Sequence, residues 1–176
     1  MFERLWAPWR LGYIQGEKLD PTCEQEVFPY LPDADRDCFL CQSVADANDR
    51  RHFVVDRTEH SLTLLNRYPY NNGHLLVSPK RHRGRLDELK ACELLDLAQT
   101  VSRMVVRLEQ LLKPAGFNVG LNLGSAAGAG LPGHLHWHIV PRWNGDTNFM
   151  PALAAVKVIP QSLESLWEAM NAGTVT

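Results

Sequence analysis

Short, mainly apolar segments bounded by polar and turn-forming residues recur in the first half of the chain, and this pattern predicts β-strands. We expect strands at about residues 52–56, 61–66 and 74–78, each rich in Val, Leu or Thr. The turn sequence YPYNNG at residues 68–73 separates the second strand from the third. Because short turns join neighbouring strands, we expect these strands to pair antiparallel.

The middle of the chain carries a helical pattern instead. From about Leu86 to Lys113 apolar residues recur every three or four positions, which predicts one long amphipathic helix on a sheet. The apolar positions include Leu94, Ala98, Val101, Met104, Leu108 and Leu111. Further strands are predicted at Phe117–Leu123 and Leu135–Val140, and a short C-terminal helix at 162–170. The expected fold class is α+β, an antiparallel sheet of about five strands with one principal helix.

The first 37 residues follow neither pattern, and we expect residues 1–37 to be an extension that packs on the body of the protein. Residues 1–14 are rich in Trp and Arg. Residues 15–37 hold several prolines and acidic side chains, which are typical of an irregular surface connection. Residues 38–176 are expected to form a single domain.

Composition limits the classes of partner. The chain has 176 residues, 45% of them hydrophobic, and a formal net charge of −2, which suits one globular domain without a basic field for nucleic acid. No apolar run approaches the ~20 residues of a membrane span. The N-terminus lacks a secretory pattern, and four unevenly spaced cysteines argue against a disulfide framework. We therefore expect a cytoplasmic protein with neither a nucleic-acid nor a membrane partner.

Three histidines at every second position, His134, His136 and His138, are separated by apolar residues. In a β-strand, alternate side chains project from the same face, so this spacing places three imidazoles together above an apolar anchor. Packed imidazoles each need hydrogen-bond partners and repel one another when charged. The pattern therefore predicts a functional site that binds metal or attacks phosphorus.

A glycine-rich loop over residues 122–133 leads directly into the histidine segment. Its glycines, among them Gly124, Gly128 and Gly130, allow backbone N–H groups to approach an anion closely. The loop lacks the Gly-Lys-Ser/Thr of a Walker motif. We expect it to bind phosphate, and a merely flexible connection is the alternative.

A Cys-x-x-Cys motif, Cys38 and Cys41, offers two ligands for a metal ion. His82 and His134 could complete a tetrahedral Cys₂His₂ set, which would be a closed, structural zinc site. A pair of ordinary reduced thiols and a redox pair are the alternatives. No organic cofactor is expected.

At these motifs the chain resembles the histidine-triad (HIT) family. The resemblance covers roughly residues 38–150, with the motifs in the order of the family. It is carried by Leu65-Asn66-Arg67, Gly73 to Val77, Pro79 to His82, Gly120-Leu121-Asn122, and His134 to Trp143. The flanks at residues 6–10 and 144–149 resemble the bacterial dinucleoside-tetraphosphate phosphorylase/hydrolase branch. The resemblance thus implies a single HIT-like domain over residues 38–176.

The resemblance implies nucleotidyl transfer or hydrolysis at the α-phosphate of a nucleotide conjugate, such as diadenosine tetraphosphate, through a nucleotidyl-histidine intermediate. It makes His136 the nucleophile, with His138 on the phosphate and His74 in support. It also places Asn66 and Asn122 at the ribose or phosphate, and Ser125 beside the phosphates. The Cys38, Cys41, His82 and His134 set matches zinc-bearing members, and a homodimer is implied.

Several alternatives remain open at this point. No Mg²⁺-binding carboxylate cluster is evident, so histidines, backbone amides and either Lys80 or Arg142 would neutralise charge, although both residues are equally compatible with a solvated surface. A nucleotide-binding module without turnover is one rival reading. A metallohydrolase with zinc on all three histidines is another, and the absence of an acidic base in the motif argues against it. Hydrolase, phosphorylase and phosphoramidase activities differ only in the acceptor or the leaving group.

Overall fold

The structure, a computed structural model, describes residues 28–148, 150 and 158–172. The Trp- and Arg-rich segment of residues 1–14 lies outside the described residues, and so does most of the expected acidic connection. The division into an extension over 1–37 and a domain over 38–176 therefore stays a prediction.

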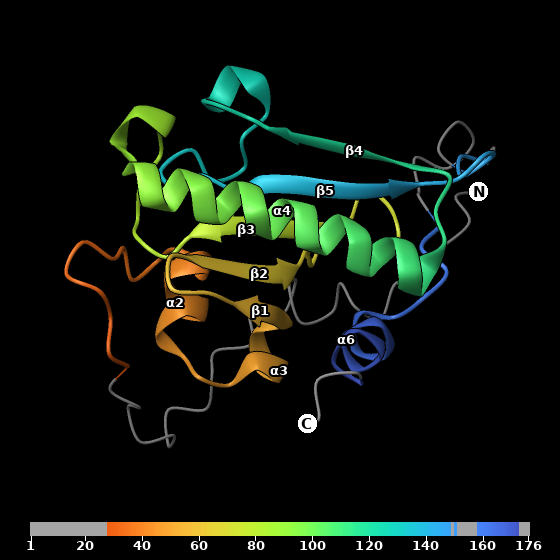
Figure 1. The fold of residues 1–176 in the computed structure, drawn as a ribbon, viewed down its shortest axis with the longest axis horizontal. Helices are drawn as coiled ribbons and strands as arrows, with labels where there is room; N and C mark the ends of the chain where they lie inside the picture. The colour runs from red at the N-terminus through yellow and green to blue at the C-terminus, as the bar shows by residue number, and fades with distance from the viewer. Residues whose placement is uncertain (1–27, 149, 151–157, 173–176) are drawn as a thin grey trace, which may run out of the picture.

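A five-stranded antiparallel sheet forms the centre of the fold, with strand order β1-β2-β3-β5-β4 (Figure 1). The strands are β1 (Val54–Arg57), β2 (Ser61–Leu65), β3 (Leu75–Pro79), β4 (Gly116–Leu121) and β5 (Trp137–Arg142). Every neighbouring pair is antiparallel. The predicted α+β class and the five strands are confirmed.

The long helix α4 (Ala91–Leu112) crosses one face of this sheet (Figure 1). Its Leu97 and Leu108 pack against Leu65, Val77 and Ile139 of the sheet to form the main core. The predicted start at Leu86 is wrong, because Leu86–Glu88 forms a separate 3₁₀ turn, η2, with a short break before α4.

The buried face of α4 also differs from the predicted one. Leu94 and Leu111 are exposed, whereas Glu93 and Thr100 are buried. The Glu93 carboxylate accepts two hydrogen bonds from the Arg81 guanidinium, at 2.6 and 2.5 Å, and this pairing allows a charged residue on the inner face. A pattern based on hydrophobicity alone assigns such a residue to the solvent.

Two short helices, α2 (Phe39–Ala45) and α3 (Asp49–His52), precede β1 and were not predicted. The Asn48 side chain caps α3 by accepting a hydrogen bond from the Arg51 N–H, and Phe53 ends it with a left-handed φ of 55°. The strand expected at residues 52–56 therefore begins only at Val54. Figure 1 shows both helices gathered at the β1 side of the sheet.

The C-terminal helix α6 (Leu163–Asn171) confirms the prediction for residues 162–170. Ser162 caps it, and Leu166 and Met170 face the main core. The Trp167 indole N–H donates a hydrogen bond of 2.7 Å to the Val54 carbonyl, which ties the helix to β1. Among the described residues, no helix has the length and apolar character needed to cross a membrane.

The histidine segment is only partly a strand. The strand β5 begins at Trp137, so His138 lies in the sheet, while His134 and His136 lie in the irregular segment that leads into it. The three imidazoles therefore do not form one uniform row on a strand face, and the backbone before β5 gives each a separate environment.

Candidate functional site

A cavity of about 700 Å³ lies against the His136 and His138 side chains. It extends across β3 and β2 towards α2 and α3. Its lining comprises Phe39, Gln42, Ser43, Arg51, His52, Leu64, Asn66, Arg67, Tyr68, Tyr70, Leu76, Gly128, Gly130, Leu131, His136 and His138. The size and the mixture of apolar walls with a few convergent polar groups are typical of a site for a small molecule.

The ring of His136 is held in one tautomer by the backbone. Its Nδ1 lies 2.8 Å from the His134 carbonyl oxygen, which can only accept a hydrogen bond, so Nδ1 carries the proton. In the neutral ring, Nε2 therefore keeps a lone pair. The residue is buried, with 8% of its surface exposed, and it lines the cavity. His136 thus presents an unprotonated nitrogen that can act as a nucleophile.

The ring of His138 is oriented by His74. The His74 Nδ1 accepts hydrogen bonds from the Tyr70 backbone N–H at 3.0 Å and from the Asn66 amide at 3.2 Å, so its Nε2 carries the proton. This Nε2 lies 2.9 Å from His138 Nδ1 and donates to it. The proton of His138 is consequently on Nε2, a buried atom without a partner among the described residues.

Burial, together with the neighbouring His136, lowers the pKa of His138 to about 4. The ring is therefore neutral at pH 7, and its Nε2–H is a neutral donor at the cavity. The Tyr70 ring stacks on the His138 ring with centroids 5.7 Å apart, which further restricts its orientation.

Asn66 lies in the cavity wall and also supports His74. Its Oδ1 accepts a hydrogen bond of 3.0 Å from the Tyr68 N–H, which fixes the amide so that its nitrogen faces His74. The glycine loop reaches the cavity through Gly128 and Gly130. Asn122, Gly124 and Ser125 are not part of the lining, although Ser125 begins the 3₁₀ turn η3 (Ser125–Ala127) of the same loop.

The two cysteines meet His82 and His134 at the other side of the histidine segment. One ligand atom from each of the four residues lies within 4.8 Å of all the others. Cys38 Sγ is 3.3 Å from His134 Nδ1, and Cys41 Sγ is 3.3 Å from His82 Nδ1. Zinc with Zn–S of about 2.3 Å and Zn–N of about 2.0 Å needs tetrahedral S···N edges of roughly 3.5 Å. The donor set therefore fits zinc.

Protonation of these ligands is consistent with a metal site. His134 Nε2 donates to the Pro79 carbonyl at 2.8 Å, which leaves Nδ1 as a lone pair facing the sulfur atoms. Burial lowers the pKa of His134 to about 4, so the ring is neutral. Burial and the neighbouring Cys41 raise the pKa of the Cys38 thiol to about 12 when no metal is present. A cation would be needed to hold the thiolate form.

Lys80 and Arg142, the two candidates for charge neutralisation, do not line the cavity. The Lys80 ammonium bonds the Thr58 carbonyl, and the Arg142 guanidinium forms a bidentate pair with Asp146 at 2.6 and 3.0 Å. The cations that do line the cavity, Arg51 and Arg67, were missed.

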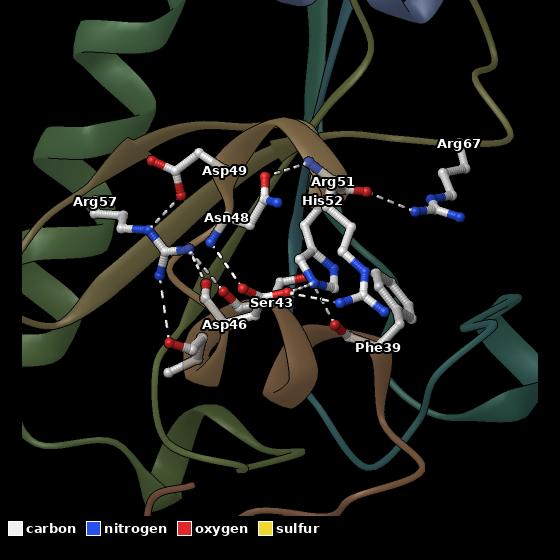
Figure 2. Close-up of polar contacts among 10 residues, drawn as sticks. Phe39, Ser43, Asp46, Asn48, Asp49, Arg51, His52, Arg57 and Arg67 are labelled. Atoms are coloured by element: carbon white, nitrogen blue, oxygen red, sulfur yellow. Dashed lines mark hydrogen bonds and ion pairs between the residues drawn. The ribbon is translucent and has the colours of Figure 1, made fainter. Parts of the chain in front are cut away.

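The missed residues belong to a polar network around Asp46 (Figure 2). The Asp46 carboxylate accepts hydrogen bonds from the Asn48 N–H at 2.8 Å and from His52 Nε2 at 2.9 Å. Burial by itself would raise the pKa of Asp46, but the hydrogen bonds from Asn48 and His52 outweigh it, so the pKa of Asp46 is lowered. The sequence signal was the basic run Arg50-Arg51-His52, which lies at the start of the strand expected at residues 52–56 and just before it.

Comparison with known proteins identifies the relatives of this chain. The HIT domain family matches residues 48–145. The chain is 37% identical over 161 residues to AP-4-A phosphorylase of Mycobacterium tuberculosis, covering 92% of this chain and 78% of the relative. It is also 37% identical over 93 residues, 53% of this chain and 50% of the relative, to the asymmetrical bis(5'-nucleosyl)-tetraphosphatase of Schizosaccharomyces pombe. Among solved structures, a Zn-bound histidine triad family protein from Mycobacterium smegmatis matches with TM-score 0.62 and 28% identity, covering 77% of this chain and 91% of that one.

Proposed function

The chain belongs to the HIT family, and on this premise we propose that it is an enzyme that cleaves dinucleoside polyphosphates, such as diadenosine tetraphosphate, at the α-phosphate. The relatives named as a phosphorylase and a tetraphosphatase both act on substrates of this class. The observation that carries the proposal is the tautomer of His136, whose Nδ1 donates to the His134 carbonyl and leaves Nε2 free at the cavity.

In the first step His136 Nε2 attacks the α-phosphorus, and a bond forms between nitrogen and phosphorus. The bond from phosphorus to the bridging oxygen breaks, and the polyphosphate departs with the electron pair. His138 Nε2–H donates a hydrogen bond to the phosphate, and N–H groups of the loop around Gly128 and Gly130 stabilise the charge on its other oxygens. His74 holds the His138 ring in the required tautomer.

In the second step an acceptor oxygen attacks the nucleotidyl-histidine and releases His136 in its starting form. Inorganic phosphate is the acceptor that the comparisons favour, because the phosphorylase matches 92% of the chain and the tetraphosphatase 53%. We therefore propose phosphorolysis in preference to hydrolysis or phosphoramidate cleavage.

Other parts of the proposal concern binding and assembly. Asn66, Gly128 and Gly130 would contact the ribose and phosphates from the cavity wall. Asn122, Gly124 and Ser125 lie outside the cavity lining and would contact the part of the substrate that extends along the same loop. Zinc held by the two cysteines, His82 and His134 would pin α2 to the segment before β5; its role would be structural, since all four positions of a tetrahedron are filled by protein. We also propose a cytoplasmic homodimer, with no nucleic-acid or membrane partner.

Product analysis with diadenosine tetraphosphate tests the proposal. We expect ADP and ATP in the presence of inorganic phosphate, whereas AMP and ATP without phosphate would indicate hydrolysis. Mass spectrometry of the quenched reaction should find a nucleotidyl adduct on His136. His136→Ala should abolish turnover, while His60→Ala, outside the cavity, should retain it. Full activity in a folded His136→Ala variant would refute the mechanism, and nucleotide binding without any product would indicate a binding module.

A further inference from the structure

The cavity continues well beyond the histidines, and its direction follows from the strand register. Leu76 of β3 pairs with His138 on one side and with Leu64 of β2 on the other. Strands in a sheet lie about 4.8 Å apart, so Leu64 is roughly 10 Å from His138 along this row. Beyond Leu64 the cavity is lined by α2 and by the end of α3. This leaves room for one nucleoside beside a phosphate at His136.

The part of the cavity beyond Asn66, which we call the far end, combines apolar walls with polar groups. Leu64 and Leu76 form its floor, and Phe39, 42% exposed, presents an aromatic ring to it. Gln42 and Ser43 of α2, together with Arg51 and His52 of α3, supply its polar groups. Apolar and aromatic side chains of this kind hold the flat faces of a nucleobase.

The His52 ring is fixed by Asp46. The carboxylate can only accept, so His52 Nε2 carries the proton of the 2.9 Å hydrogen bond. In the neutral ring Nδ1 is then an acceptor, and no hydrogen bond is assigned to it within the described part of the chain. Figure 2 shows His52 and Phe39 on one side of Asp46, with Arg57 on the opposite side.

Ser43 provides a second acceptor. The residue is 2% exposed, and its hydroxyl donates a hydrogen bond of 2.8 Å to the Phe39 carbonyl within α2. Because the hydroxyl proton is used in the helix, only the lone pairs of Oγ are left for a ligand.

The cations near the far end are already engaged. Arg51 Nη1 lies 3.5 Å from the Asp46 carboxylate. The Arg67 guanidinium lies over the Phe53 ring, 5.7 Å from its centroid, and donates to the Arg51 carbonyl at 2.9 Å. With a buried carboxylate beneath His52, the far end suits an uncharged base better than a string of phosphates.

From this arrangement we propose that His52 and Ser43 are specificity-determining residues that select a nucleobase with an exocyclic amine, adenine, for the half of the substrate transferred to His136. The two N–H groups on N6 of adenine would donate to His52 Nδ1 and Ser43 Oγ. Inosine carries a carbonyl oxygen at the same place, which would face two acceptors. This inference rests on the proposed function and deepens it.

Calorimetric titration of the full chain with AMP and with IMP tests the inference, because the two nucleotides differ at this group. We expect the protein to bind AMP at least about tenfold more tightly than IMP, the value of one neutral hydrogen bond. His52→Ala and Ser43→Ala should each bring the ratio towards one, while His60→Ala should leave it unchanged. Equal affinities in the unmodified protein, or an unchanged ratio in both variants, would overturn the inference.

Two further measurements separate this role from a structural one. Ser43→Ala favours the helix and leaves the Asp46–His52 pair intact, so its effect on selectivity cannot come from unfolding, and thermal melts will verify this. With diadenosine tetraphosphate as substrate, the loss should fall on KM rather than kcat, because the far end is remote from the phosphorus. The failure of this inference is distinguishable from the failure of the proposed function. A preference for AMP over IMP without any product from diadenosine tetraphosphate would support the inference and refute the proposed activity. Turnover of diadenosine tetraphosphate without that preference would support the activity and refute the inference.

Discussion

The His74 Nε2 atom donates to the Nδ1 atom of His138 over 2.9 Å, and the direction of this hydrogen bond is set by groups outside the pair. The Tyr70 N–H and the Asn66 amide both donate to His74 Nδ1, so the proton of His74 must face His138. The tautomer of the cavity residue His138 is thus determined by the backbone amide of Tyr70, three residues before the turn glycine Gly73.

Replacing His74 should impair the chemistry more than the binding. His74→Ala leaves His138 free to rotate and to change tautomer, and misplacement of one catalytic group can cost about 10²-fold in rate. We expect kcat for diadenosine tetraphosphate to fall by about that factor, with a small change in KM, in steady-state kinetics. His60→Ala is the matched control. Unchanged kcat in a folded His74→Ala variant would contradict the role of His74 in orienting His138.

Removing the cysteines should remove the metal. Cys38→Ser and Cys41→Ser each leave three ligands around a closed tetrahedral site, and we expect bound zinc to fall from about one ion per chain to near zero in elemental analysis. Cys92→Ser, an exposed cysteine, is the control. Zinc affinity should also fall as pH decreases, because metal binding must displace the proton of a thiol whose pKa is raised to about 12. Zinc retained by both variants would indicate another site.

A methyl group at Gly73 should destabilise the turn that carries His74. Gly73 has φ of +77°, and a Cβ there would lie 2.6 Å from Leu112 Cδ1 and 3.0 Å from Pro141 Cγ. Gly73→Ala should therefore lower the free energy of unfolding by about 2 kcal/mol or more, measured by denaturant titration. Gly120→Ala, where no heavy atom lies within 4 Å, should have a much smaller effect. Equal effects would show that the turn relaxes freely.

The Glu93–Arg81 pair should make stability depend on acid. The Arg81 guanidinium, although burial opposes it, lowers the pKa of Glu93 to about 2 from an ordinary value of 4.5. A lowered carboxyl pKa contributes stability that is present above about pH 4.5 and is lost as pH falls towards 2. Glu93→Gln should cost about 2 kcal/mol at pH 7 and should flatten this acid dependence. Glu109→Gln, on the exposed side of α4, should change neither, and a steep acid transition retained in Glu93→Gln would point to other carboxylates.

Local patterns predicted the sheet because its signals are local. The alternating Ser61 to Leu64 of β2, the apolar run Leu75 to Val77 of β3 and the turn around Gly73 are each encoded within a few residues, and all five strands were found. Glu93 shows where this fails. Its burial depends on Arg81, a residue in the loop after β3, and no hydrophobic pattern contains that information.

The candidate site divides in the same way. His74, His136 and His138 were recognised from spacing and motif, and the grouping of Cys38, Cys41, His82 and His134 was predicted and is found as one cluster. Phe39, Ser43 and His52 were not predicted as site residues. They lie on helices of seven and four residues that are too short to show periodicity, and they reach the cavity only through packing against β1.

His134 has one property with a practical consequence for genetics. Its Nδ1 faces the cysteines, its Nε2 bonds Pro79, and its carbonyl oxygen holds the nucleophile His136. The first two contacts depend on the imidazole, but the third belongs to the peptide and survives any substitution. A substitution of His134 that abolishes activity would therefore act by displacing the main chain that holds His136. Variants at position 134 should be grouped with those of Cys38 and not with those of His136.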